Sequence, residues 1–188
     1  MKIFLLLALL FFTTGCTLHQ KSTLSKVQIT EKVDNLMDGV LAFALKSESH
    51  ALEHGRKLTV SETKYAKSIG VKHPEKVRVM ISSDFPVPEN KEVLKGFKEL
   101  GFDSMLVAGI TYRYGIYIKS SWLVSKEYVL AHELIHVRQI EKTDNWKKYL
   151  RQYLIQAFSY EYFEMPYEHE AYKETENFKG FEKVEMKK

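Results

Sequence analysis

One stretch decides the fold and chemistry of this chain: Ala131-His132-Glu133-Leu134-Ile135-His136-Val137-Arg138-Gln139. The segment from Val129 to Ile140 is apolar around much of a helical circumference, which predicts a buried helix. His132 and His136 are four positions apart, so both imidazoles project from one face of that helix, one turn apart. Two imidazole nitrogens at this spacing can bind one metal ion at about 2.0–2.1 Å each.

Glu133 is rotated by one residue step from His132. Its carboxylate can therefore reach the open side of the metal ion without binding the ion, and can take a proton from a water whose pKa the ion lowers to about 7. Two histidines and a glutamate inside an apolar helix are costly to bury unless they have partners, and a metal ion supplies one. The alternative is a pair of core histidines hydrogen-bonded to backbone groups or carboxylates.

A catalytic metal site of this kind needs a third protein ligand and one open position. The chain supplies carboxylates in the later segment Tyr167-Glu168-His169-Glu170-Ala171-Tyr172. The sequence between His136 and Glu168 is long enough for one intervening helix and a return.

These two segments together resemble the gluzincins, the HExxH metallopeptidases whose third zinc ligand is a glutamate. Glu168-His169-Glu170-Ala171 matches the Glu-x-x-Ala signature of one subset, which includes prenyl-protease-like and antirepressor-type peptidases. This chain has Tyr172 where that subset usually has Asp or Asn. The resemblance covers about residues 110–174, because a short strand before a His-Glu-Leu-x-His-Val-x-Gln helix also recurs in such families.

The resemblance implies a zinc metallopeptidase with one zinc ion, acting on a peptide or protein substrate. His132, His136 and Glu168 would bind the zinc, and Glu133 would act as general base and then as proton shuttle. The alternatives are a non-catalytic zinc-binding scaffold lipoprotein of the envelope and a zinc hydrolase of a non-peptide amide.

A second ligand assignment also stays open. Thermolysin-like enzymes place the ligand directly before the Ala and an acidic residue four positions later, which would make Glu170 the alternative third ligand, supported by Glu174. We expect Glu168 rather than Glu170, and both cannot easily serve because residues two apart on a helix point to different sides. Possible stabilisers of the transition state are Tyr167, His169 and Tyr172.

The N-terminus predicts export. Lys2 precedes an apolar run over residues 3–12, and Thr13-Thr14-Gly15-Cys16 follows, as in a signal peptide. The run is too short to span a bilayer as a helix. Its end resembles a bacterial lipobox, which implies lipidation of Cys16 and a lipid-anchored protein at the periplasmic or cell-surface face of the envelope. The alternative is an ordinary secretory signal cut beyond Cys16.

Composition sets the remaining limits. The chain has 188 residues, 45% of them hydrophobic, and a net charge of +4 without a basic block, so we expect no nucleic-acid partner. Cys16 is the only cysteine, which excludes an intrachain disulfide. We expect a signal peptide at 1–15, a tether at 16–28, one domain at 29–180 and a charged tail at 181–188.

Periodicity predicts an α+β fold that is mainly helical, with a small sheet beside the helix of His132 and His136. The resemblance makes this a zincin-like domain. Thr30 and Ser125 are expected N-caps, the first of a long helix that ends near Gly55 and the second of the metal-site helix. Further helices are expected over residues 61–69, 90–100, 145–162 and 166–172, and strands over 77–81, 105–112 and 116–118.

A competing motif lies at the end of the first predicted helix. His50-Ala51-Leu52-Glu53-His54 fits the inverted His-x-x-Glu-His zinc signature. Charged residues surround it and no apolar wall encloses it. Histidines also suit the negative end of a helix dipole. We therefore expect this segment to be a solvated helix end.

Overall fold

The computed structural model describes residues 24–102, 107–121, 125–143 and 145–181. Within them lie six α-helices, four short β-strands and two single 3-10 turns, so the predicted α+β class is confirmed. The helices are α1 (Lys26–His54), α2 (Val60–Ser68), α3 (Lys91–Glu99), α4 (Lys126–Lys142), α5 (Trp146–Ser159) and α6 (Pro166–Thr175). The strands are β1 (Arg56–Lys57), β2 (Arg78–Ser82), β3 (Gly109–Tyr112) and β4 (Gly115–Lys119), and the turns are η1 (Pro74–Lys76) and η2 (Tyr162–Glu164).

The strands form one mixed sheet in the order β1-β2-β4-β3. β2 and β4 are parallel, with Val79 opposite Ile116, whereas β1 and β3 run antiparallel to their neighbours. A tight turn joins β3 to β4, so Tyr112 pairs with Gly115. Among the described residues β3 pairs with β4 alone, which leaves β3 at the edge of the sheet.

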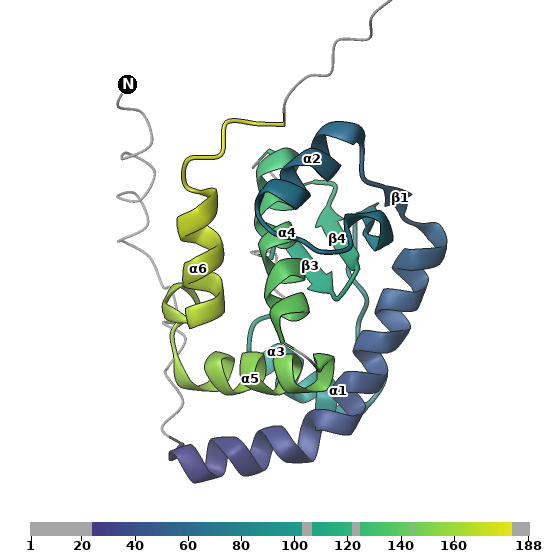
Figure 1. Cartoon of the computed structure of the whole chain (residues 1–188). Coiled ribbons are helices and arrows are strands. Elements are labelled where there is room, and N and C mark those ends of the chain that lie inside the picture. The colour runs from purple at the N-terminus through teal and green to yellow at the C-terminus, as the bar shows by residue number, and fades with distance from the viewer. Residues whose placement is uncertain (1–23, 103–106, 122–124, 144, 182–188) are drawn as a thin grey trace, which may run out of the picture.

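Alternating side chains of β4 bury both faces of the sheet. Ile116 and Ile118 pack against Leu130 and Leu134 of α4 on one face. Tyr117 packs on the other face against α1, where its hydroxyl donates to the backbone oxygen of Ser47. The sheet therefore lies between α1 and the helix of the predicted metal site (Figure 1).

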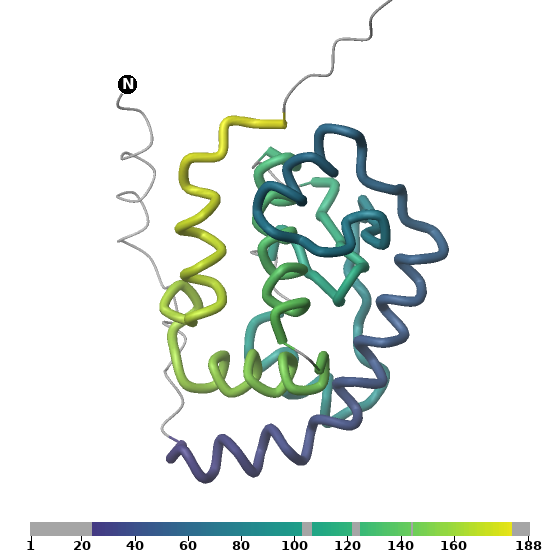
Figure 2. The backbone as a smooth tube through the Cα atoms, in the orientation of Figure 1, coloured from purple at the N-terminus to yellow at the C-terminus, as the bar shows by residue number. Residues whose placement is uncertain are grey.

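The long helix α1 packs against both α5 and the sheet. Figure 2 shows its purple and blue tube passing below α5 and then turning up beside the sheet. Its first half packs Ile29, Val33 and Met37 against Leu154 and Phe158 of α5. Within the described residues, no helix has the length and apolarity needed to cross a membrane.

The start of α1 differs from the prediction. A capping box at Ser25 and Gln28 begins the helix, so Thr30 lies inside it and donates its hydroxyl to the backbone oxygen of Lys26. The end at Gly55 is as predicted. The last residues of the predicted tether, 26–28, are thus helical, whereas residues 1–23, Cys16 among them, lie outside the described part of the chain.

The other boundaries shift by a few residues. α5 has the N-cap Asn145 but ends at Ser159, and α6 continues past Tyr172 to Thr175. Ser125 occupies the N-cap position of α4, yet its side chain makes no capping hydrogen bond. Predicted strand residues 105 and 106 lie outside the described part, and β3 begins at Gly109.

Candidate metal centre

The helix α4 presents its polar side chains inside the protein. Every residue from Val129 to Ile140 is buried, and His132 and His136 are each 6% exposed. The apolar neighbours of these histidines pack against the sheet, which orients the imidazoles toward α5 and α6. The third group, Glu168, comes from the first turn of α6 and is 1% exposed.

Donor atoms from these three side chains converge on one point. The two histidine Nε2 atoms lie 3.2 Å apart. Each is 3.3 Å from an oxygen of Glu168: His132 faces Oε2, and His136 faces Oε1. Tetrahedral ligands held about 2.0–2.1 Å from an ion lie about 3.3 Å from each other. The buried group His132, His136 and Glu168 therefore has the spacing to hold a metal ion.

A neighbouring amide determines which nitrogen of His136 is free. The side-chain nitrogen of Gln139 donates to the backbone oxygen of Tyr167 and to Oε2 of Glu170, which turns the amide oxygen toward the ring. That oxygen lies 2.8 Å from Nδ1 of His136 and accepts its proton. When the ring is neutral, Nε2 of His136 is therefore the nitrogen that carries the lone pair, the form in which histidine binds a metal.

The hydrogen bonding at the site leaves a place for a cation. Among the described residues, Oε2 of Glu168 is buried without a hydrogen-bond partner. The Nε2 lone pair of His136 and the carboxylate of Glu168 are both acceptors, and two acceptors at this distance need a positive charge between them. A metal ion would satisfy both, so the donor set fits a metal ion.

The electrostatics of the site agree with this. Burial would lower the pKa of His136, but the Glu168 carboxylate, together with Glu133 and Gln139, raises that pKa to about 9. Burial would likewise raise the pKa of Glu168, but the two adjacent imidazoles lower it strongly. Each shift expresses the same preference for a positive charge beside Glu168.

Two tyrosine hydroxyls from α5 hydrogen-bond to residues of the candidate metal centre, one to Glu168 and the other to Gln139. The hydroxyl of Tyr153 donates to Oε1 of Glu168 at 2.8 Å. Tyr149 stands one turn earlier on the same helix face, and its hydroxyl is 3.4 Å from the side-chain oxygen of Gln139. Burial is the first cause that raises the pKa of both tyrosines, so both hydroxyls remain donors at neutral pH.

Glu133 lies beside the three donor groups and is held by the edge strand β3. The hydroxyl of Thr111 donates to Oε2 of Glu133 at 2.6 Å. A Cβ atom at Gly109 would lie 2.6 Å from Oε1, so only glycine leaves room there for the carboxylate. Burial is the largest cause that raises the pKa of Glu133, while His136 and His132 act in the opposite direction.

Glu170 and Glu174 have other partners. Both pair with Arg138 of α4: one guanidinium nitrogen lies 2.7 Å from Glu170, and the other lies 2.6 Å from Glu174. The structure thus places Glu168, and not Glu170, among the converging donor atoms.

No family model matches this chain, nor does any curated protein or solved structure.

The three residues named as possible transition-state stabilisers occupy different places. The ring of Tyr172 lies 4.4 Å from the ring of His132, and its pKa is raised to about 12, chiefly by burial. The hydroxyl of Tyr167 is engaged, since it donates to the side chain of Gln152 at 2.7 Å. His169 is exposed on α6. Of the three, Tyr172 has its ring against a residue of the metal centre.

The inverted motif at the end of α1 is exposed to solvent, as expected. The rings of His50 and His54 stack 4.5 Å apart, and Nδ1 of His54 contacts the backbone oxygen of His50. Glu53 lies 3.9 Å from His54. The three side chains do not belong to the group of buried donors on α4 and α6.

Sequence reasoning missed several residues around Glu133 and Glu168. Thr111 and Gly109 belong to a segment recognised only as a strand, and no local pattern marks their contact with α4. Tyr153 belongs to a segment that the sequence predicts only as a helix. Gln139 belongs to the His-Glu-Leu-x-His-Val-x-Gln pattern, and this was the available signal for its role.

Proposed function

We propose that this protein is a zinc-dependent metallopeptidase. The observation that carries the proposal is the geometry of one site: three buried donor atoms at tetrahedral spacing, with a fourth buried side chain, Glu133, beside them. A structural metal site has no use for such a carboxylate. A site that hydrolyses a bond needs one, because a water must lose a proton as it attacks.

The donor set also bears on the metal. Two histidines and one carboxylate bind zinc in hydrolases, and they bind iron(II) in oxygenases. Glu133 favours the hydrolytic assignment, because hydrolysis needs a carboxylate beside the donor atoms that can take a proton from water and return it. A zinc ion bound at this site would polarise the scissile carbonyl and lower the pKa of water to about 7.

The residues of the chain then divide the work of hydrolysis. Glu133 accepts a proton from the attacking water as the new carbon–oxygen bond forms. It delivers that proton to the amide nitrogen as the carbon–nitrogen bond breaks, so the carboxylate ends as it began. Thr111 keeps the carboxylate oriented through the bond to Oε2. The phenol of Tyr172 remains protonated and can donate to the developing oxyanion.

The edge strand supplies a place for the substrate backbone. In the described part of the chain, β3 pairs with β4 on one side only. β3 also carries the residues that hold Glu133. An extended peptide adding along the free side of β3 would therefore run past the general base. Such pairing favours a peptide as the substrate over a compact non-peptide amide.

We further propose that the protein acts in the bacterial envelope, anchored by lipid on Cys16. This part of the proposal depends on the sequence of residues 2–16 alone. Replacing Cys16 with Ser should move the protein from the membrane fraction to the soluble fraction. Mass spectrometry should find acyl chains on Cys16 at the mature N-terminus, whereas a mature start beyond Cys16 would exclude this anchor.

The experiment that tests the enzyme is Glu133→Gln. The substitution keeps the shape of the side chain but removes the base, so zinc content and fold should be unchanged. Hydrolysis of a cleavable peptide should fall by about 10²-fold or more, the usual scale of general-base catalysis. Equal activity of the variant and the wild type on peptides and on cell-wall amides would favour the scaffold alternative.

A further inference from the structure

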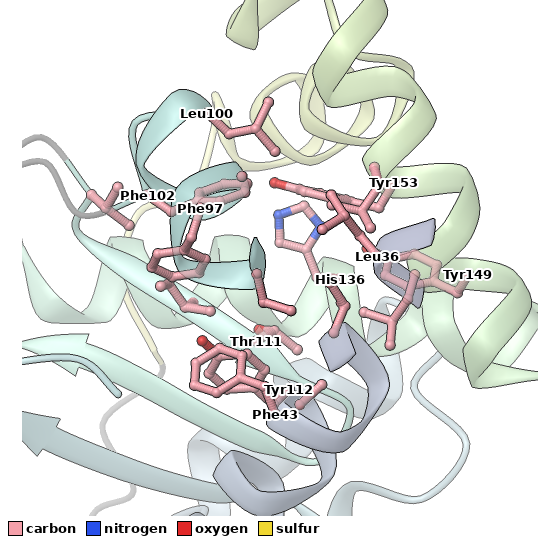
Figure 3. Close-up of a pocket in the computed structure, with 18 of the residues that line it drawn as sticks. Leu36, Phe43, Phe97, Leu100, Phe102, Thr111, Tyr112, His136, Tyr149 and Tyr153 are labelled. Carbon is pink, nitrogen blue, oxygen red and sulfur yellow. The ribbon is translucent and has the colours of Figure 1, made fainter. Parts of the chain in front are cut away.

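A cavity of about 130 Å³ lies beside the metal centre and is lined by apolar groups (Figure 3). Its walls come mostly from helices of the N-terminal half and from α5, outside the segments that carry the metal motif. The apolar lining includes Leu36, Val40, Phe43, Phe97, Leu100 and Leu154.

The cavity opens onto the reacting groups. Glu133, His136 and Glu168 belong to its lining together with Gly109 and Thr111 of β3. Figure 3 shows His136 near the centre of this space, with Phe97 on one side and Tyr153 on the other. A group that fills the cavity would therefore be continuous with a bond held at the metal centre.

Close packing between α1 and α3 holds the apolar walls of the cavity in place. Phe97 of α3 packs edge-on against Phe43 of α1 at a centroid distance of 5.8 Å, and its ring lies tilted against that of Phe102 at 5.1 Å, so neighbouring rings hold it in place. Gly39 lets α1 approach α3, because a Cβ there would lie 2.6 Å from Val93. Protein interiors are otherwise close-packed, so a cavity with rigid apolar walls beside a reactive site is a binding feature.

The volume of the cavity and the charges in its lining limit which side chain can occupy it. An apolar cavity of about 150 Å³ is known to hold one benzene molecule, so this one fits a single phenyl or isobutyl-sized group. Among the described residues of the lining, the acidic ones are Glu133 and Glu168, at the metal end. An acidic side chain would be repelled there, and a lysine would lose its hydration inside the apolar part.

We propose that this cavity is the specificity pocket of the peptidase, and that it accepts one large uncharged side chain, that of Phe, Leu or Met, from a residue flanking the scissile bond. The proposal rests on the proposed peptidase function for its substrate. The pocket itself can be tested without turnover. Peptides with Phe at this position should exceed those with Ala by about 100-fold in kcat/KM, and Asp should be excluded.

Two variants change the pocket in opposite directions. Val40→Phe places a ring in the cavity and should reverse the preference toward Ala while raising the melting temperature. Phe97→Ala enlarges the cavity and should admit Trp. A matched control makes the first change on the surface: Val60→Phe at a position 73% exposed. This control should leave the preference unchanged.

The binding measurement separates this proposal from the proposed function. The zinc-loaded full-length Glu133→Gln protein is titrated with N-acetyl-phenylalanine amide and N-acetyl-alanine amide by calorimetry or NMR. We expect the phenylalanine amide to bind, the alanine amide to bind at least 10-fold more weakly, and Val40→Phe to abolish the difference. The metal-free wild type should show the same preference.

Each outcome has one meaning. Binding of the phenylalanine amide without cleavage of any peptide would support the pocket and oppose the peptidase. Cleavage of peptides without side-chain preference, or a preference that folded Val40→Phe and Phe97→Ala proteins both retain, would overturn the pocket and leave the peptidase standing. If Val40→Phe does not fold, as judged by circular dichroism, the shift toward Trp in Phe97→Ala decides.

Discussion

Gly109 lies against Glu133 so closely that a Cβ atom at position 109 would be 2.6 Å from the carboxylate oxygen Oε1. The same Cβ would be 2.8 Å from Val129, at the start of the buried part of α4. The edge strand and the helix of the metal centre thus approach each other at a glycine. The position of the proposed general base depends on this contact.

Gly109→Ala should therefore displace the Glu133 carboxylate, whose end can move while the backbone of β3 cannot. We expect kcat to fall by about 10- to 100-fold, because small misplacements of reacting groups are costly. Zinc content should remain at one ion per chain, since the donor groups are on α4 and α6. Unchanged kcat in a folded, zinc-loaded variant would show that the contact does not position the base.

Thr111 offers a finer test of the same carboxylate. Thr111→Val keeps the shape of the side chain and removes the donor to Glu133 Oε2. A hydrogen bond to a charged group contributes about 1.5–3 kcal/mol, so kcat should fall by at least about 10-fold. Thr111→Ser restores the hydroxyl and should recover most of the activity. The pH–rate profile of the valine variant should shift as well, which a purely structural role would not produce.

Glu168 and Glu170 can be distinguished by metal content. Glu168→Ala removes the carboxylate that lies 3.3 Å from both imidazoles and should strip most of the zinc, measured after dialysis. Glu170→Ala is the matched control on the same helix. It breaks contacts with Arg138 and Gln139 and should cost about 10- to 100-fold in affinity at most. Loss of metal in the second variant alone would restore the thermolysin-like assignment.

Glu48 predicts a pH dependence of stability away from the site. Burial raises its pKa, although the backbone N–H of Tyr114 donates to Oε1 and opposes the rise. A raised folded-state pKa contributes stability that is present below the unfolded value of about 4.3 and is lost as pH rises toward the folded value. Because Gln does not titrate, the Glu48→Gln variant should not lose this contribution to folding stability as the pH rises. Its melting temperature relative to wild type should therefore climb as the pH rises above about 4, and a constant difference would contradict the shift.

Much of the site follows from local sequence. The helical spacing of His132 and His136 and the apolar residues around them predict a buried α4 with two aligned imidazoles. The choice between Glu168 and Glu170 is harder, because the face that each presents depends on where α6 begins and how it docks. The structure resolves this geometry through Arg138, which pairs with Glu170 and leaves Glu168 facing the histidines.

The limits of sequence reasoning are contacts between distant segments. The approach of Gly109 to Glu133 joins a strand to a helix, and the cavity joins α1 and α3 to α5. No periodicity in one segment reports such contacts. The misplaced start of α1 is different, because the Ser25–Gln28 capping box was visible in the sequence. The apolar pattern that begins at Val33 favours a later start, whereas helical residues 26–29 precede the expected N-cap Thr30.

The donor atoms of the metal centre come from α4 and α6, two helices with the whole of α5 between them in the chain. A bound ion would therefore link α4 to α6 across this segment of the chain. The three-residue site exists only when α6 is packed against α4. Each tenfold excess of free ion over its dissociation constant then adds about 1.4 kcal/mol against undocking. Depletion of the metal would first loosen the C-terminal helix and expose it to proteolysis, so the lifetime of the protein would follow the metal supply around it.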